Sequence, residues 1–103
     1  MATSIPRRVT VGPFVYTVTV ADELDEQRMG MVDFRHQTID LLRDQPPMQM
    51  RDTLLHEVMH AVVRFAGLDM EENERVVAAL SSILLMVLRA NPRLVAHLVA
   101  ADA

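Results

Sequence analysis

The stretch TLLHEVMHAV, residues 53–62, carries two histidines four positions apart, with a glutamate directly after the first. This is the pattern HExxH, with His56, Glu57 and His60 in its fixed positions. On an α-helix, residues i and i+4 lie on one face, one turn apart, so both imidazoles can bind one Zn²⁺. Glu57 can then act as general base on a metal-bound water. The spacing therefore predicts a helix that carries a zinc site. The other interpretation is an amphipathic helix with two surface histidines.

Length and composition limit what can surround this motif. The chain has 103 residues, which suits one hydrophobic core, so we expect a single domain over residues 1–103. Half of the residues are apolar, as in ordinary globular proteins and unlike disordered chains. There is no cysteine, so a zinc ion would be held by histidine and carboxylate instead of thiolate.

Charge and hydropathy argue against two classes of partner. The net charge is −4 and the longest basic run is Arg7-Arg8, so no nucleic-acid partner is expected. The longest apolar run, residues 76–88, is interrupted by Ser81-Ser82 and is too short to span a bilayer. We therefore expect a cytoplasmic protein with no membrane partner.

Two hairpins are predicted before the motif. Residues 9–11 and 14–20 alternate and are rich in β-branched side chains, and Gly12-Pro13 between them is typical of a turn. The positions expected to face inward are Val9, Val11, Val18 and Val20. Residues 29–34 and 37–42 predict a second hairpin around Arg35-His36. The expected fold class is α+β, with a small antiparallel sheet of three to four strands packed on the HExxH helix and a second helix.

The helix that carries the motif is expected from about residue 47 to 65, since Pro46-Pro47 suits a first helical turn and Gly67 a helix end. Asp69 is a plausible N-cap for a second helix over residues 70–90, which Asn91-Pro92 would end. Residues 93–103 repeat an apolar spacing that predicts a short terminal helix.

The second helix is apolar on nearly every side over residues 76–88. Such a helix is either central in its fold or covered by another subunit. A homodimer is therefore one expected assembly.

A catalytic zinc site usually has a third protein ligand. The longer pattern HExxHxxGxxH does not supply it, because Val63 and Ala66 stand where its glycine and third histidine would be. The second helix offers Glu71, Glu72 and Glu74. If the two helices fold back at residues 67–69, Glu74 lies within a turn of the metal and Glu71 nearly two turns away. Glu74 is thus preferred over Glu71, and the other interpretation is that all three only stabilise a helix N-terminus.

With Glu74 as ligand, the pattern resembles a minimal gluzincin, a class of zinc metallopeptidases. Asn73-Glu74 is similar to the Asn-Glu pair that carries the third ligand in that class. The class also has an aspartate four or five residues later that supports a histidine ligand, and this chain has Ala78 and Ala79 at those positions. The residue that supports the histidine is therefore not identified from the resemblance. The core LLHEVMHA, residues 54–61, and the element order over residues 8–92 resemble the small ImmA/IrrE-type and SprT-like metallopeptidases and short phage or prophage proteins. The resemblance implies a zincin-like fold and a peptide or protein substrate.

Side chains that stabilise an oxyanion are few. Tyr16 is expected to pack at the edge of the core. Arg35 and His36, at a hairpin tip, are expected to be solvated turn residues, and the alternative is that this tip overhangs the metal. The sequence predicts a zinc-dependent peptidase in which Glu57 is the general base. The alternative is a catalytically silent, zinc-binding module that acts as an oligomeric interaction or regulatory protein.

Overall fold

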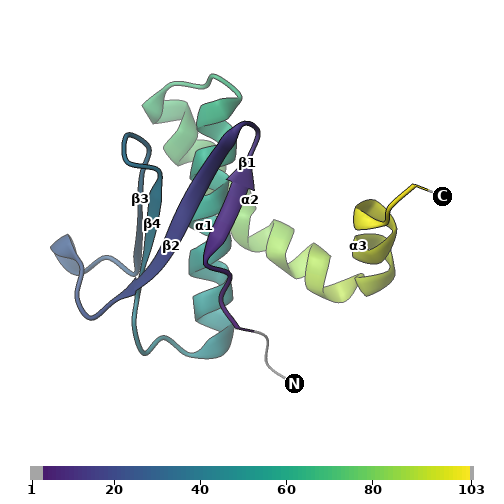
Figure 1. Ribbon diagram of the computed structural model, residues 1–103, viewed down its shortest axis with the longest axis horizontal. Helices are drawn as coiled ribbons and strands as arrows, with labels where there is room; N and C mark the ends of the chain where they lie inside the picture. The colour runs from purple at the N-terminus through teal and green to yellow at the C-terminus, as the bar shows by residue number, and fades with distance from the viewer. Residues whose placement is uncertain (1–3, 103) are drawn as a thin grey trace.

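The computed structural model describes residues 4–102. Its elements follow the chain as β1 (Arg8–Val11), β2 (Phe14–Ala21), a 3-10 turn η1 (Asp25–Gln27), β3 (Gly30–Asp33), β4 (Thr38–Leu42), α1 (Pro47–Phe65), α2 (Met70–Ala90) and α3 (Pro92–Val99). Figure 1 shows the sheet on one side of α1. α2 packs on α1 and on α3 but on no strand, so α1 lies between the sheet and α2. The fold is α+β, as expected, and its central element is the motif helix α1, whereas α2 lies on the outside and is not central.

The sheet has the strand order β1-β2-β4-β3. β1 pairs with β2 and β3 pairs with β4 in antiparallel fashion, so both predicted hairpins are confirmed. β2 and β4 are parallel, with Thr17 opposite Thr38 and Ala21 opposite Leu42. The sheet is thus mixed, and the prediction of an antiparallel sheet was wrong for this central pair.

The burial of the second hairpin explains the parallel pairing. Ile39 and Leu41 in β4 are fully buried, while the residues of β3 are only half-buried. The more apolar strand takes the central place beside β2, and the connection over residues 22–29 carries the chain to the outer edge first. β3 is therefore an edge strand, and it packs against α1.

Local signals set the helix boundaries where the sequence placed them. Pro47 is the first residue of α1, and Gly67, with φ of +92°, lies in the turn that follows it. Asp69 caps α2, because its Oδ1 accepts a hydrogen bond of 2.8 Å from the Glu72 amide. α3 ends at Val99 and is shorter than predicted, with residues 100–102 non-helical and residue 103 outside the described residues.

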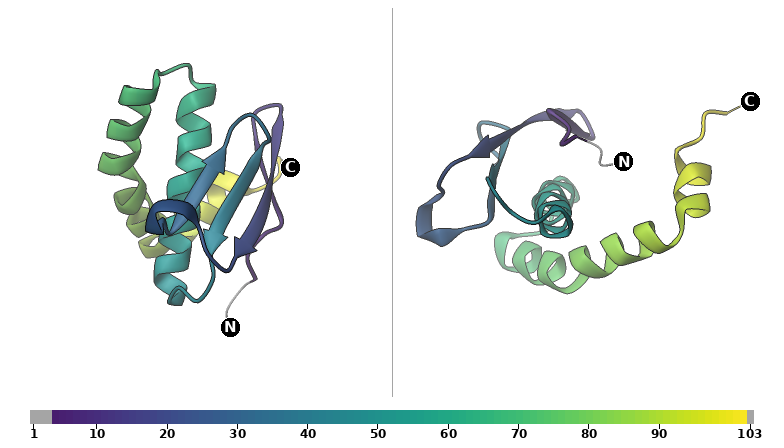
Figure 2. Two further views of the ribbon diagram at one scale, coloured as in Figure 1. Left: turned by 90° about the vertical axis from the view of Figure 1, so that its left-hand side faces the viewer. Right: turned by 90° about the horizontal axis from the view of Figure 1, so that it is seen from below.

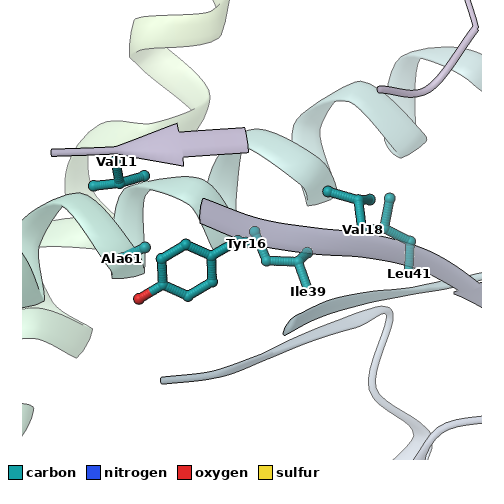
Figure 3. Close-up of a cluster of buried hydrophobic side chains, with 6 residues drawn as sticks. All are labelled: Val11, Tyr16, Val18, Ile39, Leu41 and Ala61. Atoms are coloured by element: carbon teal, nitrogen blue, oxygen red, sulfur yellow. The ribbon is translucent and has the colours of Figure 1, made fainter. Parts of the chain in front are cut away.

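The core lies between the sheet and α1. Its buried side chains are Val11, Tyr16, Val18, Ile39, Leu41 and Ala61, drawn in Figure 3. Of the four valines predicted to face inward, Val11 and Val18 are buried, whereas Val9 and Val20 are half-buried. Tyr16 is 4% exposed, deeper than the core edge where it was expected. These contacts fix the face that α1 turns to the sheet.

The C-terminal end of α2 and all of α3 extend away from the sheet and α1, as Figure 1 and the right-hand view of Figure 2 show. The Cα radius of gyration is 14.1 Å, against about 13 Å for a compact domain of this length. Among the described residues no single helix is long and apolar enough to cross a membrane, and α2 and α3 meet that test only as a pair bent by 95°.

Candidate metal centre

The two histidines of the motif point their outer nitrogens at each other. The Nε2 atoms of His56 and His60 are 3.2 Å apart, and their rings meet edge to face at 81°. Both side chains project from α1 one turn apart, as their spacing predicted. Two nitrogens bound to one tetrahedral Zn²⁺ at about 2.0–2.1 Å lie about 3.3 Å apart. The donor pair therefore fits a shared zinc ion.

Asn73 on α2 holds His60 by two hydrogen bonds. Its Nδ2 donates to the His60 backbone carbonyl at 3.0 Å, so its Oδ1 is the atom 2.6 Å from His60 Nδ1. Because Oδ1 can only accept, Nδ1 carries the hydrogen and Nε2 keeps its lone pair. Asn73 is 1% exposed, so water cannot replace these bonds. The His60 ring is thus held in the tautomer that a metal ligand needs.

Ser81, two turns further along α2, supports His56. Its Oγ lies 3.2 Å from His56 Nδ1 and is almost fully buried. Burial, and then the neighbouring His60, lower the pKa of His56. A lowered pKa keeps the imidazole neutral near pH 7, which is the form that binds metals.

Asn73 and Ser81 were not identified as site residues from the sequence. The sequence has Ala78 and Ala79 where the gluzincin pattern has an aspartate that supports a histidine. Asn73 and Ser81 provide hydrogen bonds to the histidines in its place. A signal was present, because Asn73, Val77 and Ser81 follow one another every four residues and share the face of α2 that is buried on α1. Polar residues on such a face require partners there.

Glu57 lies beside the histidines on the side of α1 that faces the sheet. It is 7% exposed, and burial raises the pKa of its carboxyl group, an effect that nearby His60 opposes. A raised pKa makes the carboxylate a stronger base. Gly30 on β3 makes this arrangement possible. A Cβ atom there would lie 2.7 Å from Thr53 Cγ2 and 3.2 Å from Glu57 Cγ.

Glu74 is the preferred third ligand from the sequence, and its Oε2 lies 3.9 Å from His60 Nε2. A carboxylate oxygen sharing a tetrahedral Zn²⁺ with that nitrogen would lie about 3.4 Å away. The Glu74 side chain is 68% exposed, so it is free to move by this difference. As the structure stands, no three His, Cys, Asp or Glu side chains within residues 4–102 are arranged to hold a metal ion.

The other two glutamates lie elsewhere. Glu71 and Glu72 form the first turn of α2, and neither lines the hollow that contains the histidines. The charge of Glu74 acts on this hollow: it opposes the lowering of the His56 pKa by burial and adds to the raising of the Glu57 pKa by burial. Among the three candidates, geometry favours Glu74.

The histidines open into a polar hollow of about 420 Å³ between α1, β3 and the start of α2. Its walls are formed by Arg28, Gly30, Val32, Phe34, His56, Glu57, His60, Met70 and Glu74. A second hollow of about 450 Å³ shares Arg28, Gly30, His56 and Glu57 with it and continues along α1 toward Gln49. Arg28 was not singled out in the sequence, where it follows an acidic loop without any motif.

Three residues were considered as oxyanion stabilisers, and the structure places none of them in the wall of the hollow at the histidines. Tyr16 lines a separate hollow of about 270 Å³ with Phe14 and Phe65. His36 is hydrogen-bonded to Asp33 in the β3–β4 turn, 2.8 Å from Nδ1 to Oδ2. Neither these two nor Arg35 lines the hollow at the histidines.

Comparisons with protein-family models, with curated proteins and with solved structures found no match to this chain. Its function is therefore inferred from the geometry of the site.

Proposed function

We propose that this protein is a zinc-dependent hydrolase of peptide bonds, of a minimal zincin-like type. The observation that carries the proposal is the separation of 3.2 Å between the His56 and His60 Nε2 atoms, beside a buried Glu57. His56, His60 and Glu74 would hold the zinc ion. The chemistry of this donor set, two neutral imidazoles and a carboxylate, is that of a catalytic zinc site with one open position.

Zinc bound there would supply a Lewis acid that polarises a carbonyl group and makes water more acidic. Glu57 accepts the proton from the attacking water, since its raised pKa suits a general base near neutral pH. It then returns the proton to the leaving amine. Asn73 and Ser81 keep the imidazole rings oriented during this cycle.

The two adjoining hollows support a peptide as the substrate. They run along α1 beside β3, an edge strand, and both include His56 and Glu57. An edge strand has unpaired backbone groups that an extended peptide can pair with. The substrate would therefore lie along β3 with its scissile bond at the histidines.

A second function is favoured by one specific observation. Ser81, His56, His60 and Asn73 form a continuous chain of hydrogen bonds that satisfies every nitrogen of both rings without a metal. No buried side-chain nitrogen or oxygen in the described part of the chain lacks a partner. The cluster would then join α1 to α2 in a catalytically silent module.

A comparison of wild type with Glu57→Gln separates the two functions. Both proteins are purified without chelator or added zinc, assayed for metal, and incubated with a peptide library derived from cell lysate. The enzyme predicts one zinc ion per chain in both and cleavage by wild type only. Equal peptide profiles, with or without zinc bound, would favour the silent module. A His56→Ala/His60→Ala variant that retains as much zinc as wild type would exclude the proposed metal site.

A further inference from the structure

Along α2 and its projecting C-terminal end runs an apolar stripe that the other residues within 4–102 leave largely uncovered. The stripe consists of Val76, Leu80, Ile83, Val87 and Ala90, of which Leu80, Ile83 and Val87 are 51%, 59% and 42% exposed. It lies on a different side of α2 from Asn73, Val77, Ser81 and Leu85, which are buried on α1. Within the described residues α2 therefore has two apolar sides, of which one is buried on α1 and the other is largely exposed.

The spacing of the stripe is that of a coiled-coil seam. Its residues are separated by four, three, four and three positions, the alternation that places apolar side chains along one line of a helix. No residue from 76 to 88 is charged, so nothing in the seam repels a second apolar helix. This pattern fits a helix as the partner.

The exposed area is sufficient for a pair of copies. Besides the stripe, Met86, Leu94, Leu98 and Val99 on the same projecting segment are 42% to 76% exposed. With on the order of 100 Å² per fully exposed side chain of this size, each copy leaves about 400 Å² of apolar surface uncovered. If α3 of each copy packs beside the seam as well, two copies bury about 800 Å² of apolar area, or about 1,200 Å² in total when about 65% of the interface is apolar, the lower end of stable interfaces.

The charges at the two ends of α2 favour an antiparallel pair. The first turn of α2 carries Glu71 and Glu72. Arg89 lies in the last turn of α2, and Arg93 follows at the start of α3. An antiparallel pair places the acidic end of one helix beside the basic end of the other and opposes the helix dipoles. A parallel pair would bring like charges together.

We propose that the α2 helices of two copies of this chain pair antiparallel along Val76, Leu80, Ile83 and Val87, forming a homodimer. In this register Leu80 of one copy faces Ile83 of the other, and Val76 faces Val87. Since α2 also carries Asn73 and Ser81, the dimer holds rigid the helix that positions both histidines. The pairing itself requires neither zinc nor activity.

Sedimentation velocity at about 50 µM, with and without chelator, tests the pairing. Wild type is expected to sediment as a dimer and Ile83→Glu as a monomer with unchanged helix content. Val15→Glu places the same charge at an exposed valine of β2, 46% exposed and outside the segment, and should remain a dimer. A monomeric wild type, or a dimer that Ile83→Glu leaves intact, would overturn the proposal, as would a wild type that is monomeric and bound to anionic lipid vesicles.

Mixing charged variants tests the orientation. Leu80→Arg and Ile83→Glu should each be monomeric, and their mixture should recover a heterodimer because residues 80 and 83 face each other in the antiparallel pair. Ile83→Arg mixed with Ile83→Glu should recover less. If the Ile83→Arg and Ile83→Glu mixture recovers more heterodimer than the Leu80→Arg and Ile83→Glu mixture, the antiparallel arrangement is overturned. These results do not depend on catalysis, so failure of the proposed peptidase function leaves them unaffected.

Discussion

The Nδ1 atom of His60 lies 2.6 Å from the Oδ1 atom of Asn73, and this bond joins the motif helix to the helix behind it. The second bond, from Asn73 Nδ2 to the His60 carbonyl, fixes the amide so that only one ring tautomer is possible. α2 therefore sets the tautomer of His60, which leaves the Nε2 lone pair available to a metal ion.

Asn73→Ala should weaken both stability and zinc binding. It leaves the buried His60 Nδ1–H without a partner and removes the second hydrogen bond to the His60 carbonyl, so the free energy of unfolding should fall by about 1–3 kcal/mol in urea titrations with chelator present. Loss of the ring's support should lower zinc affinity by about 10–100-fold in competition with a chromophoric chelator. Asn91→Ala serves as the control, because it removes an exposed hydrogen bond from Asn91 Nδ2 to the Val87 carbonyl. It should leave zinc affinity unchanged. Equal affinity in both variants would contradict the assigned role of Asn73.

Gly30→Ala should disturb Glu57 through a steric contact. The added Cβ lies 2.7 Å from Thr53 Cγ2 and 3.2 Å from Glu57 Cγ, so β3 and α1 must separate, at a cost of about 1–3 kcal/mol in unfolding free energy. Thr53→Ser removes the Cγ2 methyl group and keeps the hydroxyl that donates to Gln45 Oε1. The double variant Gly30→Ala/Thr53→Ser should therefore regain most of the loss in thermal or urea denaturation. No recovery would mean that the Thr53 methyl is not the obstacle.

Much of the fold was predictable because its signals are local. Pro47, Gly67 and Asp69 set helix boundaries within a few residues of themselves, and each hairpin has its turn between its own strands. The i, i+4 spacing likewise predicted that His56 and His60 would meet. These features depend on backbone geometry over one or two turns.

The features that the sequence did not predict depend on contacts between distant segments. The parallel pairing of β2 with β4 follows from which hairpin strand is buried more deeply, a competition that alternation alone does not rank. Asn73 and Ser81 acquire their role only because α2 folds back on α1 with one particular face. Arg28 reaches the hollow through the path of the 22–29 connection, where Glu26 and Gln27 have positive φ.

The carboxyl group of Asp33 should titrate below its ordinary range. Hydrogen bonds from the His36 side chain and then its backbone amide lower the pKa of Asp33. Because the folded pKa is below the unfolded one, the stabilisation is present above about pH 4 and is lost as pH falls through the folded value. His36→Ala removes the largest cause and should raise the Asp33 pKa in a carbon-detected NMR titration, while the backbone bond keeps part of the shift. An unchanged pKa would show that the side-chain bond does not form in solution.

Replacing Glu74 tests the third ligand directly. Glu74→Gln keeps the size of the side chain but removes its charge, so zinc affinity should fall by more than about tenfold, in line with the loss of a ligand. Glu71→Gln makes the same change one turn away, at an exposed position that does not line the hollow, and should alter affinity by less than about twofold. The two variants should also differ in stability. A tenfold loss of zinc affinity lowers the free energy of unfolding at saturating zinc by about 1.4 kcal/mol. Urea titrations of the two variants at one fixed free zinc concentration measure it. Equal losses would mean that only the overall negative charge of this helix end matters, and a loss confined to Glu71→Gln would move the ligand to that residue.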